Sequence, residues 1–266
     1  MKKTVEKRLT AIQKYLLDNE KATVKDLSVL LQVTPEMIRK DLTFLEEKGF
    51  LFRTHGGAVL RNSNIDIPIS IRSKGKVELK KQLCSKAIDL IHDEDCLFID
   101  PSSTLLHLGN LIRLRKNLTV VTNCFDFLNT ARDANQTIFF LGGRYSATGN
   151  RTEGQFQLSM VEKFRFDIAF FGSDGVLHMD GPGTQSNDAI FLNETVLASS
   201  KQNVLVLDSS KFSLSSRYKY ADYSDFDVLI TDHIRLFDPG PLIGPKLSGF
   251  GPRCCDMTYA YTPSYR

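Results

Sequence analysis

The residues best suited to binding chemistry stand directly after short apolar runs in the second part of the chain. Some are hydroxyl residues at the start of a stretch with a helical pattern, residues 103–112. The first turn of a helix leaves backbone N–H groups free and carries the positive end of the helix dipole, so it attracts anions. Others are glycines, which let a ligand approach the backbone, or carboxylate, amide and ammonium groups. These residues are Asp100, Ser102, Ser103, Thr104, Asn123, Gly142, Gly143, Asp208 and Lys211.

Such a set predicts a site for a small molecule with a phosphate group at one end and hydroxyl groups at the other, which describes a sugar phosphate. Carboxylates at strand ends can also act as general bases, so Asp100, Asp174 and Asp208 leave an enzyme open as an alternative. No histidine is placed to pair with them, since His107 and His178 stand alone. Each motif taken singly also fits an ordinary turn between a strand and a helix. The prediction therefore depends on the motifs meeting in one place.

The apolar runs predict the scaffold that would bring these motifs together. They cover residues 96–100, 118–122, 137–141, 168–172, 204–208 and 228–232. Helical patterns lie at 76–91, 103–112 and 126–133. Short apolar strands that alternate with helices are typical of a mostly parallel α/β sheet buried on both faces. Ligands of such sheets bind just beyond the carboxyl ends of the strands.

The beginning of the chain follows a different pattern. Residues 5–17 have the apolar spacing of an α-helix, and Thr23 is the predicted N-cap of a second, shorter helix. Thr34 caps a third helix, Pro35 takes its first position, and Gly49 is expected to end it. The buried side of this third helix is predicted to consist of Ile38, Leu42 and Leu45.

The opposite side of the third helix carries the adjacent cations Arg39 and Lys40, and a strand–turn–strand pattern follows at 50–60. A tightly joined helix pair followed by a basic hairpin predicts a winged helix-turn-helix, whose third helix enters the major groove of DNA. The residues expected to contact DNA are Thr34, Glu36, Met37, Arg39, Lys40, Thr43, Arg53, His55 and Gly56. A three-helix module whose cations only keep it soluble is the alternative.

The charge distribution agrees with a nucleic-acid partner for the first segment. Residues 1–61 hold 12 Lys and Arg against 8 Asp and Glu, whereas the remainder holds 22 against 23. We therefore expect a winged helix-turn-helix domain at 1–61 and a linker at 62–75. An α/β effector-binding and oligomerisation domain should follow at 76–235. The segment 236–266 is rich in proline and glycine, which oppose helices and central strands, and is predicted to be a poorly ordered tail.

The composition excludes several classes of protein. The hydrophobic and charged fractions, 42% and 24%, are those of a globular protein. No run approaches the roughly 20 apolar residues that span a bilayer, and the N-terminus lacks the apolar core of a secretory signal. We therefore expect a cytoplasmic protein without a membrane partner. The five cysteines lack the spacing of a zinc site, so we expect neither a metal nor a cofactor.

The motifs resemble those of the DeoR-type family of bacterial transcriptional regulators over about residues 7–232. The most specific part is IRKDLTFLEEKGFLFRTHGGAV at residues 38–59, and DPSST, TN, LGG, GSDG and DSSKF follow in the order of the family. The resemblance implies a C-terminal domain similar to sugar-phosphate isomerases that binds a phosphorylated intermediate as inducer. It also implies that Asp188 supplies an acidic group before a helix. Ser102 stands where the family commonly has glycine.

The expected protein is thus a homo-oligomer, a dimer or larger, that binds double-stranded operator DNA and represses a carbohydrate operon. A phosphorylated sugar in the C-terminal domain would relieve the repression, and no residue would be catalytic. Two alternatives stay open. One is an enzyme similar to sugar-phosphate isomerases with an added DNA-binding module. The other is a constitutive DNA-binding protein whose α/β domain only dimerises it.

Overall fold

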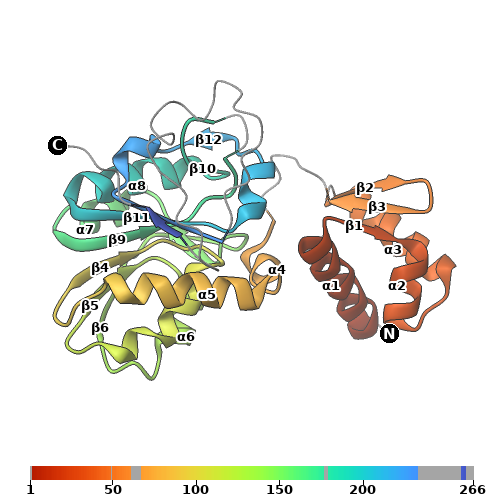
Figure 1. Ribbon diagram of the computed structural model, residues 1–266, viewed down its shortest axis with the longest axis horizontal. Coiled ribbons are helices and arrows are strands. Elements are labelled where there is room, and N and C mark those ends of the chain that lie inside the picture. Colours follow the sequence, from red (N-terminus) through yellow and green to blue (C-terminus); the bar gives the residue numbers. More distant parts are fainter. Residues whose placement is uncertain (1, 49, 61–66, 177–178, 233–258, 262–266) are drawn as a thin grey trace. The chain divides into compact units, whose positions relative to one another are not determined.

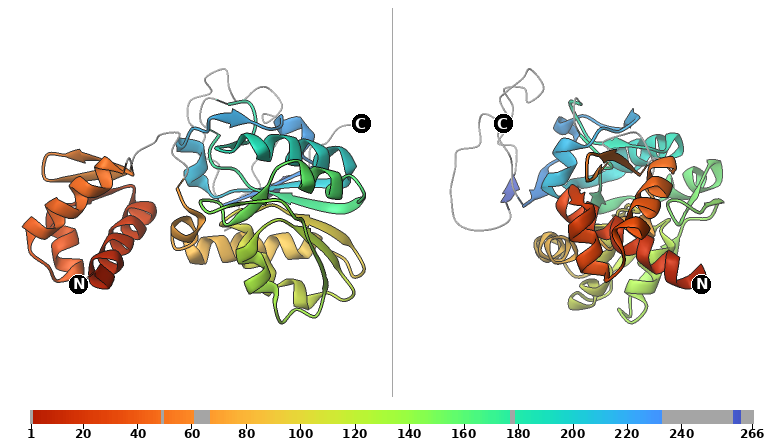
Figure 2. Two further views of the ribbon diagram at one scale, coloured as in Figure 1. Left: turned by 180° about the vertical axis from the view of Figure 1, so that it is seen from behind. Right: turned by 90° about the vertical axis from the view of Figure 1, so that its right-hand side faces the viewer.

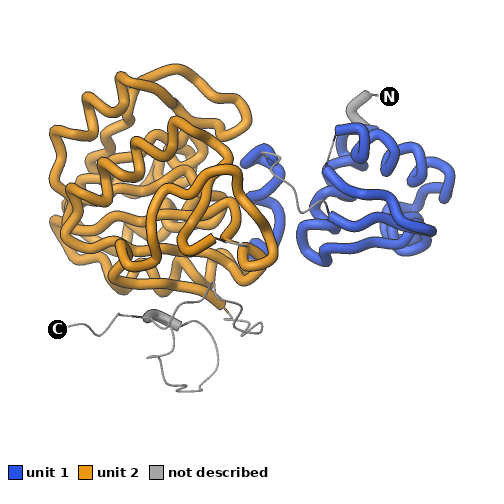
Figure 3. The backbone as a smooth tube through the Cα atoms, turned by 90° about the horizontal axis from the view of Figure 1, so that it is seen from above, with its two compact units in different colours: residues 1–77 blue, residues 78–266 orange. Residues whose placement is uncertain are grey.

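The computed structural model of the chain describes residues 2–48, 50–60, 67–176, 179–232 and 259–261 (Figure 1, Figure 2). The chain forms two compact units, Met1–Val77 and Glu78–Arg266 (Figure 3). Each unit has a hydrophobic core of its own.

Unit 1 contains the predicted helices and wing, together with two elements that the sequence analysis missed. Its elements are α1 (Lys2–Asn19), β1 (Lys21–Thr23), α2 (Val24–Leu31), α3 (Pro35–Glu47), β2 (Leu51–Thr54), β3 (Gly57–Leu60) and α4 (Ile69–Arg72). The caps form as expected, because Thr23 accepts the Asp26 N–H and Thr34 accepts the Met37 N–H. Gly49, the expected end of α3, lies outside the described residues.

The wing is an antiparallel sheet in the order β1-β3-β2. Strands β2 and β3 pair up to Thr54 and Gly57, so only His55 and Gly56 form the turn. Gly56 has a φ of 85°, a conformation that favours glycine. Strand β1 was not predicted because a three-residue strand has no readable alternation. Helix α4 lies within the segment 62–75, which the sequence analysis interpreted as a linker.

The core of unit 1 forms where α1, α2 and α3 pack together. Ile38, Leu42 and Leu45 are buried, as predicted. Leu30 on α2 is 54% exposed, because α2 buries the side that carries Leu27 instead. These packed residues hold α3 in place and leave its opposite side to solvent.

Unit 2 is built on a sheet in the order β14-β13-β11-β9-β4-β5-β6. Six strands are parallel and confirm the predicted runs: β4 (Cys96–Ile99), β5 (Thr119–Thr122), β6 (Thr137–Phe140), β9 (Phe166–Phe171), β11 (Ser200–Val206) and β13 (Val228–Thr231). The short β14 (Tyr259–Tyr261) pairs antiparallel with β13 at one edge. It is the described part of the segment 236–266, whose other residues lie outside the description.

Helices cover both faces of this sheet (Figure 2). One face carries α5 (Val77–Ala87) and α6 (Phe125–Ala131), and the other carries α7 (Gln155–Val161) and α8 (Asn187–Ser199). The helix predicted over 103–112 is wrong in type. The chain there forms the 3-10 helices η2 (Leu105–Asn110) and η3 (Ile112–Leu114), and a further one, η1 (Ile88–Leu90), follows α5.

The remaining elements of unit 2 are short. They are the pair β7 (Arg144–Ser146) and β8 (Arg151–Glu153), the pair β10 (Gly183–Thr184) and β12 (Tyr218–Lys219), and the 3-10 helices η4 (Ser209–Ser213) and η5 (Tyr223–Asp225).

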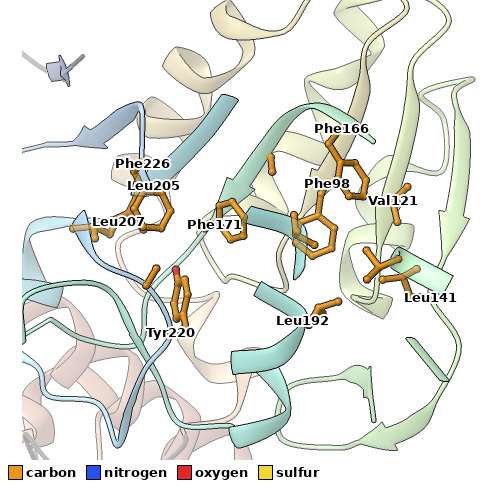
Figure 4. Close-up of a cluster of buried hydrophobic side chains, with 14 of the residues drawn as sticks. Phe98, Val121, Leu141, Phe166, Phe171, Leu192, Leu205, Leu207, Tyr220 and Phe226 are labelled. Carbon is orange, nitrogen blue, oxygen red and sulfur yellow. The ribbon is translucent and has the colours of Figure 1, made fainter. Parts of the chain in front are cut away.

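The core of unit 2 is rich in aromatic rings (Figure 4). The ring centroids of Phe98 and Phe166 lie 5.8 Å apart in an edge-to-face arrangement, and Phe171 lies 5.6 Å from Phe226. Contacts of this kind add to the stability gained from burying the rings. The core therefore holds β4 and β9 firmly, and the loops at their carboxyl ends start from fixed points.

Candidate functional site

The outer side of α3 presents polar and charged groups to solvent. Thr34, Glu36, Arg39 and Lys40 are exposed, and Met37 is 38% exposed. Lys40 Nζ lies 3.9 Å from Glu36 Oε1, a long contact between two exposed groups that contributes little stability. These side chains can therefore exchange their contacts with water for contacts with a ligand at small cost.

The wing is tied to α3 through Arg53. Its guanidinium donates to Thr43 Oγ1 at 3.0 Å, and its backbone N–H donates to Glu46 Oε1 at 2.7 Å. The Thr43 hydroxyl in turn donates to the Arg39 carbonyl at 2.9 Å. The exposed turn at His55 and Gly56 is thereby held in a set relation to the cations of α3. All nine residues expected to contact DNA thus lie on α3, its cap or the wing.

A second group of polar residues lies at the carboxyl edge of the unit 2 sheet, where the parallel strands end together. The Gly172 N–H, after β9, donates to Asp100 Oδ2, after β4, at 3.2 Å. A Cβ on Gly172 would lie 2.5 Å from Ser102 Cβ, closer than such atoms approach. The chain therefore needs glycine here to let Ser102 and Asp100 meet the end of β9.

Tyr220 contacts the same strand end. It is buried, and its hydroxyl donates to the Gly172 carbonyl at 2.5 Å. Burial, and then the negative charges of Asp100 and Asp174, raise the pKa of Tyr220 well above its ordinary value. The phenol therefore stays neutral and keeps donating its hydrogen bond across the working pH range.

Asn123, after β5, joins the strand end to the β8–α7 segment. Its side-chain amide donates to the Thr152 carbonyl at 2.9 Å and to Gln157 Oε1 at 3.1 Å. Its Oδ1 atom is buried without a hydrogen-bond partner among the described residues. Thr122 Oγ1 donates to the Ile99 carbonyl and so binds the ends of β4 and β5 to each other.

Glu153 is the centre of an ionic cluster beside these strand ends. It accepts hydrogen bonds from Arg151 at 3.0 Å, Arg144 at 3.1 Å and the Ser186 hydroxyl at 3.1 Å. Arg144 also donates to Asp188 Oδ2 at 2.8 Å, so this acidic residue, which was expected before a helix and lies in the first turn of α8, joins the same cluster. The cluster connects β7, β8 and the start of α8.

Gly143 lies next to this cluster and has a φ of 155°. A Cβ at this position would lie 2.5 Å from the Glu153 carbonyl oxygen. Gly142, its neighbour, donates its backbone N–H toward Met160 Sδ at 3.3 Å. Gly143 thus lets the chain after β6 pass close to β8, and Gly142 contacts α7 through Met160.

The other expected site residues occupy different positions. Asp208 is buried and caps η4 by accepting the Ser210 N–H at 3.1 Å, and the Lys211 carbonyl accepts the Val176 N–H. The side chains of Ser103 and Thr104 are buried, 4% and 2% exposed. They precede a six-residue 3-10 helix rather than an α-helix, so the dipole expected for an anion site is weaker.

The sequence analysis missed several residues of this edge. Thr122, Arg144, Arg151, Glu153, Ser186 and Tyr220 reach it from elements far apart in the sequence. For these residues the amino-acid sequence offers one signal, the spacing of Arg151 and Glu153 within one short strand. Over the part of the chain that the structure describes, no group of three His, Cys, Asp or Glu could hold a metal ion. No described helix is long and apolar enough to cross a membrane.

The fold and these two sites define a protein with a winged helix-turn-helix unit and a separate α/β unit of the sensor type. A family model described as the DeoR-like helix-turn-helix domain matches residues 8–64, and one described as the DeoR C terminal sensor domain matches residues 76–233. The chain therefore belongs to the DeoR family. It is a transcriptional regulator and not an enzyme, as the names of its relatives also indicate.

The relatives are similar along most of their length. The lactose phosphotransferase system repressor of Staphylococcus epidermidis is 29% identical over 85% of this chain and 91% of its own. The HTH-type transcriptional repressor GlcR of Bacillus subtilis is 29% identical over 86% of this chain and 89% of its own. Among solved structures, ribose 5 phosphate isomerase A from Neisseria gonorrhoeae is 18% identical with a TM-score of 0.38, covering 53% of this chain and 54% of its own.

Proposed function

We propose that the protein represses a carbohydrate uptake or catabolic operon and that a phosphorylated sugar, bound at the carboxyl edge of the unit 2 sheet, relieves the repression. Two relatives support the first part. Both are named as repressors, and one is named for a lactose phosphotransferase system. The second part is carried by one observation. Asp100, Gly172, Asn123 and Gly143, which follow four neighbouring parallel strands, meet at one edge.

The DNA would be read by the first turns of α3. Arg39 and Lys40 are long exposed cations that can reach guanine edges or phosphates in the major groove. The wing turn at His55 would contact the DNA backbone and set the register of the helix. Thr34, Glu36, Met37, Thr43, Arg53 and Gly56 complete this proposed surface.

The effector would bind in unit 2 through groups of two kinds. Carboxylates such as Asp100 and Asp188, and the amide of Asn123, suit sugar hydroxyls. Lys211, the hydroxyl of Ser102 and the backbone N–H groups near Gly142 suit a phosphate. Asp208, Ser103, Thr104 and Gly143 would support these groups rather than touch the ligand, as their burial or backbone role indicates.

Induction would work by a shift between two arrangements of an oligomer. Helix-turn-helix dimers bind two half-sites about one DNA turn apart, so both reading helices must fit at once. A ligand that binds more tightly to a second arrangement of the subunits lowers the population that can hold DNA. The ligand needs no contact with the DNA-binding unit.

The test is a thermal-shift screen of the full chain against a panel of sugar phosphates, with the matching free sugars and inorganic phosphate as controls. A ligand that binds only the folded state stabilises it by about 2.7 kcal/mol at a hundredfold excess over its dissociation constant. A hit should also release the protein from the promoter DNA of its own operon in a fluorescence anisotropy assay. A full panel without a single stabilising sugar phosphate would refute the proposed effector class.

A further inference from the structure

The surface of unit 2 has an apolar region that the proposed function does not use. Phe156 and Met160, one turn apart on α7, are 79% and 37% exposed, and Phe139 on β6 is 44% exposed. Met160 lies beside the end of β6 through its contact with Gly142. Phe139 contacts the ring of Phe164, which follows α7, at 5.2 Å. We call the surface made by Phe139, Phe156 and Met160 the α7 face.

The α7 face lies next to an open edge of the sheet. Among the described strands, β6 pairs with β5 alone, so its outer N–H and C=O groups have no strand partner. Proteins usually cover such an edge, or place charges or proline on it, because it invites pairing with another chain. Here the edge strand TIFF carries neither, and an exposed phenylalanine stands in it. Adjoining exposed apolar side chains of this kind mark an interaction site.

The charges beside the α7 face indicate what covers it. Lys163 lies in the turn after the end of α7, and its backbone N–H donates to the Met160 carbonyl at 3.1 Å, so it follows Met160 closely in the direction of the helix. Lys163 and its neighbour Glu162 are both exposed, and neither forms an ion pair with another described residue. The face therefore has an aromatic ring at one end, an apolar centre and a cation at the other end.

This pattern is complementary to itself. In a two-fold contact, a residue i of one subunit meets residue j of the other, and the reverse. If two α7 helices pack antiparallel about Met160, each Lys163 comes to lie over Phe156 of the partner subunit, where a cation and an aromatic ring attract each other. A different protein would fit the α7 face equally well only if it happened to carry the same sequence of an aromatic ring, an apolar centre and a cation.

We propose that the α7 face is the surface through which two copies of this chain associate, with the two-fold axis near Ser159 and Met160. The proposal rests on the proposed function in one respect, since a regulator that reads two half-sites needs paired subunits. It adds the particular surface and the helix that lies at its centre.

The first experiment measures self-association of the full chain by sedimentation equilibrium. Phe156→Lys removes the ring and places a cation opposite Lys163 of the partner subunit, so it should weaken dimerisation by at least about tenfold. Leu114→Lys is the matched control, because Leu114 is 59% exposed and lies on η3, which continues from the η2 helix that packs with α6. Equal dimer dissociation constants for the wild type and Phe156→Lys, or a wild type that stays monomeric, would overturn the proposal.

The second experiment does not depend on weakening the contact between the two subunits. Ser159 is exposed and lies between Phe156 and Met160, so a cysteine there would face its own copy across the axis. In a background with Cys254→Ser and Cys255→Ser, Ser159→Cys should form a covalent dimer rapidly under mild oxidation. Lys86→Cys, an exposed position on α5 at the other face of the sheet, is the control and should cross-link slowly. Equal rates at the two positions would contradict the proposed axis.

Operator binding, measured on the same samples, separates this inference from the proposed function. A wild type that dimerises through the α7 face but ignores duplex DNA would refute the function and leave the interface intact. A wild type that binds its operator while Phe156→Lys dimerises normally would refute the interface alone.

Discussion

Arg53 on the wing donates a hydrogen bond to Thr43 on α3, with 3.0 Å between the guanidinium nitrogen and Oγ1. The bond joins the two parts of the DNA-binding unit that must meet a duplex together. Without it, the wing would still form, because β2 pairs with β3, but its angle to α3 would be less restricted.

Thr43→Val should therefore lower operator affinity by several-fold, since a hydrogen bond of this kind is worth about 1 kcal/mol. The measurement is fluorescence anisotropy with promoter DNA. Thr195→Val is the matched control, because Thr195 on α8 makes the same type of bond to a backbone carbonyl four residues earlier but lies in unit 2. If both variants bind as the wild type does, the Arg53–Thr43 bond does not order the wing.

Arg39→Ala should weaken operator binding by about 1–3 kcal/mol if the guanidinium contacts a base, and the loss should differ between operator sequences. Lys86→Ala removes an exposed cation of unit 2 and should leave binding unchanged. Titrations at two salt concentrations distinguish a base contact from a phosphate contact, because only the latter changes the salt dependence markedly. Unchanged affinity in Arg39→Ala would remove Arg39 from the interface.

Asp41→Ala should destabilise unit 1 by roughly 3–5 kcal/mol, because it leaves the Arg8 guanidinium mostly buried without its counter-charge. Arg8 binds Asp41 through two nitrogens, at 2.5 and 2.9 Å, and both side chains are largely buried. Circular dichroism during urea unfolding gives the change. Asp26→Ala, at an exposed position on α2, should cost only the loss of a cap contact. Similar losses in the two variants would argue against the ion pair.

Asp167 should make stability depend on pH in the acid range. The Cys96 N–H and then Lys201 hold the pKa of this carboxyl below its ordinary value. A lowered pKa in the folded state means that the stabilisation is complete above about pH 4 and is lost as the pH falls through the folded-state value. The urea midpoints of the wild type and Asp167→Asn should differ at pH 6 and converge toward about pH 2.

The control for this prediction is Asp133→Asn, an exposed aspartate beyond α6 that has no hydrogen bond or ion pair with the described residues. Its midpoints should follow those of the wild type at every pH. A constant difference between Asp167→Asn and the wild type down to the lowest pH would show that packing, not charge, explains the effect.

Gly172→Ala should disturb the effector site, since the new Cβ would lie 2.5 Å from Ser102 Cβ. Forcing such a contact typically costs about 1–3 kcal/mol. Adding Ser102→Gly removes the atoms in conflict and should restore both the thermal stability and the response to the effector. Failure of the second change to rescue the first would mean that the backbone at Gly172, rather than Ser102, sets the requirement.

The alternation of strands and helices in unit 2 could be predicted because the parallel strands are buried on both faces and therefore read as continuous apolar runs, such as FDIAFF in β9. The caps of α2 and α3 could be predicted because a cap acts within four residues. The 3-10 form of η2 could not, since the choice between 3-10 and α-helix depends on the neighbouring α6 rather than on the local sequence. Strand β1 could not be predicted either, because it pairs with β3, which lies more than 30 residues later.

The sequence by itself determined the three helices of unit 1, the six parallel strands of unit 2, their order and the exposed cations of α3, because these follow from local periodicity and capping. Only the tertiary structure decided which distant groups meet. Glu153 gathers Arg144, Arg151 and Ser186, and Tyr220 meets Gly172 across 48 positions. The physical reason is that such contacts depend on the order of strands in the sheet and on the packing of its faces. No local pattern along the chain records either of them.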